Sequence, residues 1–349
     1  MARTSVSSAR VFLVESRLKR PFITALGRRE STVNAAILVR LKSGAQGYGE
    51  ASTSIAQKHL TPQALHRALS SMALRARGRD VRGWRALVDE AWTRHGELSP
   101  AVAAFEAALL SALAQEAGTS LAGWLGGAKR RLETDVTISA SNEPAETKAA
   151  ASEAAAAGFR VLKVKVGGRP ADDLARVAAV RATAPKARLL LDGNQGFTPA
   201  GALRFVAAVL KTGAAVELFE QPTPKADLAG LAFVAKRCPI PVAADESAAT
   251  PADAARAADA GVSAINIKLA KSGVSRGLEI AAVARAAGLP LMIGCMAETA
   301  RGLAASVHLA LGTGFFTWCD LDSDVLLVEN AEERLTAGWT RRGRFAVLE

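Results

Sequence analysis

The chain has 349 residues, of which 50% are hydrophobic, enough to bury the core of two domains or of one barrel with an added segment. Its formal net charge is +11. The excess lies in residues 1–134, where 20 Lys and Arg stand against 10 Asp and Glu, scattered over segments with few aromatic residues. Because nucleic-acid-binding surfaces gather basic residues and add aromatic residues that stack on bases, this composition argues against a nucleic-acid partner.

The sequence also gives no sign of a membrane segment or of a disulfide framework. It has no run of 18 apolar residues, and its first residues lack the apolar core of a secretion signal. Cys238, Cys295 and Cys319 have no Cys-x-x-Cys spacing, so reduced thiols are expected. We therefore expect a cytoplasmic protein with no membrane partner.

The first 130 residues predict a separate α+β domain. Strands are expected at residues 11–14, 32–41 and 47–50, with a polar loop at residues 18–30. Helical sequence follows from residue 62 to about residue 116. Residues 323–349 are too few for a domain of their own, and we expect them to complete this first one.

Residues 131–322 predict a barrel of alternating strands and helices. Short apolar strands are expected at residues 135–139, 161–166, 188–192, 216–220, 241–245, 264–268, 290–294 and 315–320. Alanine-rich amphipathic sequence fills the gaps between them, which is typical of parallel βα units. An open doubly wound sheet is the competing architecture, but no Gly-x-Gly-x-x-Gly opens the first unit, and eight regular units favour closure.

Two lysines lie on one face of the second of these strands. Side chains alternate along a strand, so Lys163 and Lys165 share a face while Leu162 and Val164 point the other way. If that face is enclosed, burial and mutual repulsion are expected to lower the pKa of both amines towards the range of a general base. The simpler alternative is a half-exposed strand with a polar face.

Polar residues then recur at the ends of the following strands. The steps from Lys165 to Asp192, Glu220, Asp245 and Lys268 are 27, 28, 25 and 23 residues, each about one βα unit. In a parallel barrel such residues meet at one mouth, at the carboxyl ends of the strands. Three carboxylates gathered there need a counter-charge, and an oxygen donor set without His or Cys predicts a hard divalent cation, Mg²⁺.

This arrangement predicts a reaction type. A cation that binds a substrate carboxylate stabilises the negative charge that forms when the adjacent carbon loses its proton, and an amine can take that proton. Lys165 precedes the acids and Lys268 follows them along the chain. Bases on two faces of one carbon can remove a proton from one side and return it on the other, which yields the epimer.

The motifs resemble those of the enolase superfamily, muconate-lactonizing-enzyme subgroup, over essentially the whole chain. They are Lys163-x-Lys165, Asp192 in Asp-Gly-Asn-Gln, Glu220 in Glu-Gln-Pro, Asp245 in Ala-Asp-Glu-Ser, and Lys268 in Asn-Ile-Lys. The resemblance implies an α/β fold, a modified (β/α)7β barrel of the TIM type beneath an α+β capping domain. Gly193 and Glu106 stand where the family more often has Ala and Asp, away from the predicted catalytic residues.

The resemblance also implies roles for these residues. Asp192, Glu220 and Asp245 would hold one Mg²⁺ per subunit, and Lys165 and Lys268 would be the acid/base pair. Lys163 would help to set the pKa of Lys165 and would contact the substrate carboxylate. Barrels of this family commonly form oligomers, so a homo-oligomer is expected.

Within the subgroup, the sequence looks like that of a dipeptide epimerase. The motif at residues 293–298 is followed by Asp320 and Asp322, which in that family hold the ammonium of a dipeptide. Two carboxylates two residues apart on a strand point the same way and form an anionic pocket. Muconate, a dianion, would be repelled there. Other residues expected at the substrate are Phe22, Arg29, Thr137, Met296 and Glu298.

The identity of the substrate side chain stays open. Residues 22–29 and Ile55 are expected to select it, and Arg29 could pair with an acidic side chain, but Glu30 could neutralise Arg29 or favour a cationic one. Acidic, hydrophobic and cationic second residues therefore remain possible. The rival reactions within the subgroup are N-acylamino-acid racemisation and o-succinylbenzoate synthesis. A basic, non-catalytic nucleic-acid-binding protein is the remote alternative.

Overall fold

The computed structural model describes residues 2–328 and 337–349. Within these ranges the largest sheet has eight parallel strands in sequence order, as in a barrel. Its strands are β5 (Val136–Ile138), β6 (Val161–Lys165), β7 (Arg188–Asp192), β8 (Val216–Glu220), β9 (Val242–Ala244), β10 (Ala264–Lys268), β11 (Leu291–Gly294) and β12 (Phe316–Asp320). Each lies within a predicted strand, so the predicted α/β barrel is confirmed.

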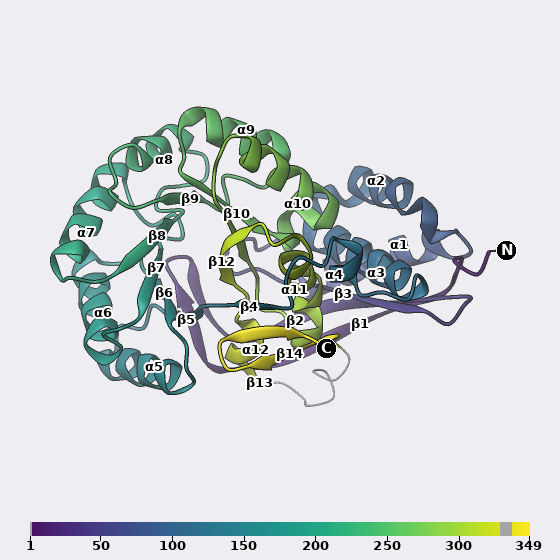
Figure 1. Ribbon diagram of the computed structural model, residues 1–349, viewed down its shortest axis with the longest axis horizontal. Coiled ribbons are helices and arrows are strands. Elements are labelled where there is room, and N and C mark those ends of the chain that lie inside the picture. The colour runs from purple at the N-terminus through teal and green to yellow at the C-terminus, as the bar shows by residue number, and fades with distance from the viewer. Residues whose placement is uncertain (1, 329–336) are drawn as a thin grey trace.

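Helices connect each of these strands to the next. They are α5 (Pro144–Ala156), α6 (Pro170–Thr183), α7 (Pro199–Lys211), α8 (Leu228–Ala235), α9 (Pro251–Ala260), α10 (Leu269–Ala286) and α11 (Ala300–Thr313). Four begin with proline, whose fixed φ suits the first helical turn. Figure 1 shows α5 to α9 as an outer arc around the strands. Apolar helix faces thus cover the outside of the sheet, and polar strand ends face the mouth.

The barrel nearly closes between β12 and β5. The sheet order runs from β12 to β5 without a ladder between these two strands, but the backbone N–H of Asp135 donates to the carbonyl of Cys319 over 2.9 Å. Small and medium side chains fill the interior: Val161, Leu190, Leu218, Ala243, Ala264 and Met292 form one buried cluster. This layer forms a floor beneath the polar residues at the strand ends.

The N-terminal part forms a second core against an antiparallel sheet. Its strands are β1 (Val6–Thr24), β2 (Gly27–Leu41) and β3 (Gln46–Ala51), covered by α1 (Pro62–Ala76), α2 (Trp84–His95) and α3 (Ser99–Glu116). Gly47 and Gly49 of β3 lie against α3 so closely that a Cβ on Gly49 would fall 1.8 Å from the carbonyl oxygen of Ala104. Short helical turns η1 (Val81–Gly83), η2 (Gly96–Leu98) and α4 (Leu121–Trp124) complete this part.

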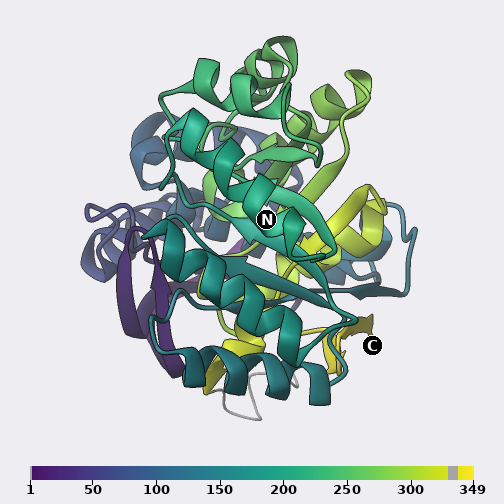
Figure 2. The ribbon, with the colours of Figure 1, turned by 90° about the vertical axis from the view of Figure 1, so that its left-hand side faces the viewer.

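The expectation of a loop at residues 18–30 is wrong. These residues continue β1 and β2 as a long hairpin, with Phe22 paired to Arg29 and Thr24 to Gly27. Gly27 has φ of 151°, which other residues rarely adopt, and it allows the tight reversal. Figure 2 shows this purple hairpin beside the teal helices of the barrel. The hairpin therefore carries residues of the N-terminal sheet to the barrel mouth.

The C-terminal residues divide between two sheets. After α12 (Ser323–Leu326), β13 (Leu327–Val328) pairs with Arg17 and Leu18 of β1. In contrast, β15 (Phe345–Leu348) pairs with β14 (Trp339–Arg342) and β4 (Arg131–Glu133) in a separate three-stranded sheet. Residues 329–336, part of the segment expected to complete the first domain, lie outside the described residues.

One helical stretch has the length and hydropathy of a membrane span. It covers Val81–Glu116, and 78% of its most apolar window is buried inside the protein. Such burial is typical of the core helix of a soluble protein, and α3 packs in this way between β3 and α10.

Candidate active site

A cavity opens at the carboxyl ends of the barrel strands, beneath the β1–β2 hairpin. Most of the predicted site residues line it: Phe22, Arg29, Thr137, Lys165, Asp245, Lys268, Met296, Asp320 and Asp322. Lys163, Asp192 and Glu220 lie beneath its surface with no exposure at all. Glu298 differs from the expectation, since it lines a smaller neighbouring cavity between α3, α10 and α11.

The three predicted carboxylates end three adjacent strands. Asp192 and Glu220 are the last residues of β7 and β8 and lie directly opposite each other in the ladder. Asp245 comes directly after β9, and the backbone N–H of Asp245 is held by Gln221 Oε1 over 2.8 Å. The strand-end spacing seen in the sequence thus places three carboxylates on one rim.

Lys163 is enclosed by carboxylates from three directions. Its Nζ lies 3.0 Å from Asp192 Oδ2, 2.6 Å from Glu220 Oε2 and 2.6 Å from Asp320 Oδ2. Its side chain has no exposure and does not line the cavity, so the predicted contact with the substrate carboxylate stays a prediction. Lys163 joins the three-carboxylate group to Asp320.

Lys165 and Lys268 flank the carboxylates on opposite sides. Lys165 Nζ donates to Asp192 Oδ2 over 2.6 Å, and Lys268 Nζ lies 2.8 Å from Asp245 Oδ2. Both lysines line the cavity. The ring of Phe22, from the hairpin, lies 5.5 Å from Lys165 Nζ and covers that ammonium from the cap side. Two amines therefore face one space from two strands.

The expectation of a lowered pKa is wrong for Lys163, and the pKa of Lys268, for which no shift was expected, is raised as well. Burial lowers the pKa of each amine, but the surrounding carboxylates outweigh burial, and both pKa values lie well above the ordinary value. The carboxylates responsible are mainly Asp192, Asp320 and Glu220 for Lys163, and Asp245 and Glu220 for Lys268. The expectation considered the repulsion between the two lysines. The attraction between each ammonium and the carboxylates in contact with it is larger and raises the pKa.

The three carboxylates fit a hard divalent cation. Burial and the nearby charge of Asp192 raise the pKa of Glu220 to about 8, so its negative charge is under-compensated by the protein's own groups. Lys163 Nζ is close to Glu220 Oε2 but not aligned for a hydrogen bond, and this oxygen has no hydrogen-bond partner within the described ranges. An all-oxygen set with an unsatisfied buried acceptor is what Mg²⁺ takes as ligands.

Sequence reasoning missed Lys271, a fourth lysine at the mouth. Its Nζ donates to Asp245 Oδ1 over 2.6 Å, to the Asp245 carbonyl, and to the Asn266 carbonyl over 3.1 Å. Lys271 thus fixes both the side chain and the backbone of one predicted ligand. The signal was its place three residues after Lys268, a spacing that brings side chains to one side of a helical turn.

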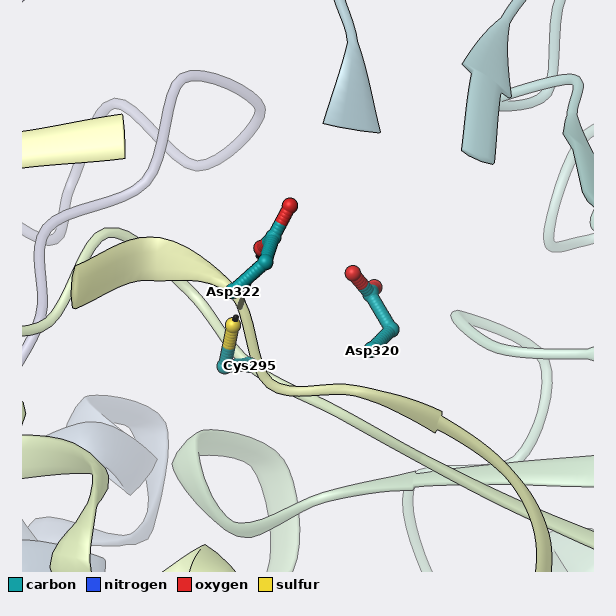
Figure 3. A group of neighbouring side chains, drawn as sticks. All are labelled: Cys295, Asp320 and Asp322. Carbon is teal, nitrogen blue, oxygen red and sulfur yellow. Dashed lines mark hydrogen bonds between the residues drawn. The ribbon is translucent and has the colours of Figure 1, made fainter. Parts of the chain in front are cut away.

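Asp320 and Asp322 form an acidic pocket where β12 meets the cavity. Figure 3 shows their carboxylates beside Cys295, and the ligand atoms of the three residues lie within 4.8 Å of one another. Asp320 is the last residue of β12, whereas Asp322 lies beyond the strand, and its Oδ2 accepts the backbone N–H of Thr137 over 2.6 Å. Burial and the charge of Asp320 raise the pKa of Asp322 to about 6.

A third carboxylate lies behind this pair and was not predicted. Asp135 is buried directly before β5, and neither of its oxygens has a hydrogen-bond partner among the residues described. Burial and the charges of Asp320 and Asp322 raise its pKa well above the ordinary value. The available signal was its alternation with Thr137, which places both side chains on the inner face of β5.

The cap supplies an apolar wall with one guanidinium. Leu18, Leu26 and Ile55 line the cavity together with Arg29. Arg29 donates to the Thr53 carbonyl over 3.2 Å and makes no ion pair in the part of the chain that the structure describes. Glu30 pairs instead with Arg28, with 2.8 Å between Arg28 Nη2 and Glu30 Oε1, on the exposed side of the hairpin. Glu30 therefore does not neutralise Arg29.

Fold and cavity together are those of a barrel enzyme in which three strand-end carboxylates lie between two lysine amines. The family model described as Enolase C-terminal domain-like matches residues 146–346. The chain belongs to this family, and with it to the enolase superfamily recognised from the sequence motifs.

More particular similarities point to one group within it. The chain is 39% identical to an aromatic dipeptide epimerase of Herpetosiphon aurantiacus over 94% of this chain and 92% of that protein. It is also 39% identical to an L-Ala-D/L-Glu epimerase of Thermotoga maritima, over 92% of this chain and 94% of that one. The structure resembles a dipeptide epimerase of Enterococcus faecalis V583 solved with Mg and L-Leu-L-Tyr, with a TM-score of 0.91, 30% identity, and coverage of 99% and 97%.

Proposed function

We propose that the protein is a Mg²⁺-dependent dipeptide epimerase that inverts the α-carbon of the C-terminal residue of a dipeptide. The observation that carries the proposal is the arrangement of one cavity. Lys165 and Lys268 flank a three-carboxylate group, and Asp320 and Asp322 form an acidic pocket that Lys163 separates from this group. A zwitterion whose carboxylate and ammonium are separated by one peptide unit matches the amines and the acidic pocket in charge.

The lysines carry the proton transfers in this proposal. One amine, at Lys165 Nζ or Lys268 Nζ, takes the α-proton, and the other ammonium returns a proton to the opposite face of the same carbon. Asp320 and Asp322 accept hydrogen bonds from the α-ammonium and fix the register of the dipeptide. Lys163 holds Asp192, Glu220 and Asp320 together beneath the substrate.

Asp192, Glu220 and Asp245 would hold one Mg²⁺ per subunit. When bound, the ion supplies positive charge beside the substrate carboxylate, where negative charge develops as the α-proton leaves. Lys271 keeps Asp245 in place for this role through its contacts with the Asp245 side chain and backbone.

The cap favours an acidic side chain at the residue being inverted. Arg29 lines a cavity whose cap wall is otherwise largely apolar, and burial lowers the pKa of its guanidinium. A carboxylate that reached it would form a partly desolvated ion pair, stronger than one in water. The same apolar wall accommodates a hydrophobic side chain with less affinity. The guanidinium of Arg29 repels a cationic side chain.

The remaining features of the proposal concern the whole chain. Residues 1–130 and 323–349 act as the capping domain, and residues 131–322 act as the catalytic barrel. Cys238, Cys295 and Cys319 are free thiols, which supports a cytoplasmic location. A homo-oligomer is also part of the proposal, as the resemblance to this family implies.

Incubation with substrates in D₂O containing Mg²⁺ tests the proposed function. L-Ala-L-Glu, L-Ala-L-Phe and L-Ala-L-Lys are compared with N-acetyl-L-glutamate and N-acetyl-L-phenylalanine by mass and by NMR of the α-proton. We expect deuterium and inverted configuration at the C-terminal residue of the dipeptides, most rapidly for L-Ala-L-Glu. Exchange confined to the N-acyl compounds would instead identify an N-acylamino-acid racemase, because these substrates have no ammonium for the Asp pair.

A further inference from the structure

A buried carboxylate of the cap, which has no part in the proposed function, binds the barrel beside Lys268. Glu106 lies in the middle of α3 with no exposure, far along the chain from every residue of the proposed site. Burying a carboxylate is costly, and burial raises the pKa of Glu106 despite its hydrogen bonds. A group held at such a cost needs a structural reason beyond core packing.

Glu106 binds a break in the helix that follows Lys268. Lys268 ends β10, α10 starts at the next residue, and the helix is interrupted at Gly273, where φ is 69° and ψ is −174°. Beyond the break, Glu106 Oε2 accepts the backbone N–H of Val274 over 2.7 Å, and Oε1 accepts that of Ser275 over 3.0 Å. The carboxylate thus caps a helix start, where free N–H groups and the helix dipole favour negative charge.

The fit around this break leaves little freedom. A Cβ on Gly273 would lie 2.1 Å from Glu106 Oε2 and 3.7 Å from the Trp92 ring. On the near side of the break, Ser99 Oγ, at the start of the same cap helix, donates to the Ala270 carbonyl over 2.9 Å. One cap helix therefore holds the turn of residues 269–275 at both ends, and this turn follows Lys268 directly.

We propose that Glu106 is a positioning residue for Lys268, acting from the cap through the turn of residues 269–275. The inference rests on the proposed function, because it assigns Lys268 as one of two bases. Lys165 lies on β6, on the opposite side of the carboxylates, and has no connection to this turn among the contacts of the described chain. A loosened turn therefore displaces Lys268 and leaves Lys165 in place. Lys271 of the same turn is held separately, by the carbonyls of Asp245 and Asn266.

Because only one of the two bases is displaced, exchange should slow for one epimer and not for the other. The α-proton exchange of the L,L- and L,D-epimers of one dipeptide is measured separately in D₂O for the wild-type protein, Glu106→Gln and Lys268→Ala. Gln keeps one acceptor but places an NH₂ group against a backbone N–H. We expect Glu106→Gln to slow exchange of one epimer by at least tenfold, since a displacement near 1 Å costs about 10²-fold. The affected epimer is the one whose exchange Lys268→Ala removes.

The control is a cap variant that is destabilised without touching the turn. Leu65→Ala opens a cavity in the cap core, where Leu65 is fully buried. We expect it to change exchange of the two epimers equally. Equal slowing of both epimers in Glu106→Gln, or no slowing, overturns the positioning role. If Glu106→Gln does not fold, Ser99→Ala tests the same role, because it removes the hydrogen bond to the Ala270 carbonyl. We then expect a smaller slowing of exchange for the same epimer. Equal slowing of both epimers, or no slowing, contradicts the role. A wild-type protein without any exchange refutes the proposed function itself.

Discussion

Two lysines that are neighbours on one strand have different surroundings. Lys163 has no exposure and touches three carboxylates, whereas Lys165 lines the cavity and touches Asp192 alone among these acids. An ammonium held by three acids is a poor proton acceptor, because each acid stabilises its charged form. The geometry therefore separates a structural cation from an amine that faces the substrate.

The two-base assignment predicts an incomplete reaction when one base is removed. Lys268→Ala should lower epimerisation by about 10²- to 10⁴-fold, the usual contribution of a general acid or base. Lys165 should still exchange the α-proton of one epimer in D₂O. Lys42→Ala, which removes an exposed cap lysine, is the control and should behave as the wild type. Full epimerisation by Lys268→Ala would refute the assignment.

The acidic pocket predicts a defect in binding. Asp322→Asn keeps an acceptor for the Thr137 N–H but removes one negative charge, so the α-ammonium loses a charge-assisted hydrogen bond. We expect KM for a dipeptide to rise about tenfold or more, in line with the 1.5–3 kcal/mol of such a bond, while kcat changes less. An N-acetylated dipeptide, which lacks the ammonium, should respond little to the substitution. Unchanged KM for the free dipeptide would mean that the pocket binds something else.

Glu298 predicts how stability depends on pH. Burial and the nearby charge of Glu50 raise the pKa of Glu298 to about 8, against about 4.3 in an unfolded chain. The unfolded state therefore releases this proton first, and the contribution of Glu298 to stability is present below about pH 4 and lost as the pH rises towards 8. Glu298→Gln should flatten this dependence by a few kcal/mol between pH 5.5 and 8 in urea unfolding. Parallel pH profiles for the two proteins would contradict it.

At the scale of elements, barrel strands were predictable and the hairpin was not. The bounds of β7, β8 and β10 coincide with the predicted strands because each is a short run, mostly apolar, that ends in a polar residue. None of residues 18–24 and 27–30 is buried, because they face the cavity and solvent, so they lack the alternation of a half-buried strand. Their pairing depends on the hairpin partner and on β13, which is distant in sequence.

The site shows the same limit. Lys163, Lys165 and the strand-end carboxylates follow from a regular period along the sequence, and the structure brings them together. Lys271 and Asp135 carry only a local spacing signal and Glu106 carries none, while the contacts of all three run across turns and between chain segments. Lys271 reaches Asp245 only because the turn after β10 bends its side chain back towards the mouth. Such contacts depend on tertiary structure, which spacing alone does not encode.

The hairpin predicts how specificity can be changed. Arg29→Met removes the guanidinium from the cavity but keeps an apolar side chain of similar length, so exchange of L-Ala-L-Glu should fall at least tenfold relative to L-Ala-L-Phe. Arg28→Met is the matched control, because Arg28 pairs with Glu30 on the exposed face. We expect it to leave the ratio of the two dipeptides unchanged. An equal shift in both variants would mean that overall charge, not the position of Arg29, sets the preference.

At the scale of the whole molecule, the site is assembled by both parts of the chain. The barrel supplies acids and amines on rigid strand ends, and the hairpin, α3 and the residues after β12 close and brace the mouth. A pocket built this way concentrates negative charge, and the repulsion between these charges destabilises the fold. Ligands that neutralise the charge should therefore stabilise the entire protein.

Mg²⁺ should raise the melting temperature. An ion that binds only the folded state at 100 times its Kd adds about 2.7 kcal/mol, which for a chain of this size is a shift of about 4 °C. EDTA should reverse the shift, and NaCl at equal ionic strength should not reproduce it. Glu220→Gln should melt no lower than wild type without Mg²⁺, because the folded site already disfavours the charge of Glu220, but it should lose the response to Mg²⁺. A full Mg²⁺ response in Glu220→Gln would place the ion elsewhere, since Gln at this position leaves a neutral amide in place of the middle carboxylate of the three.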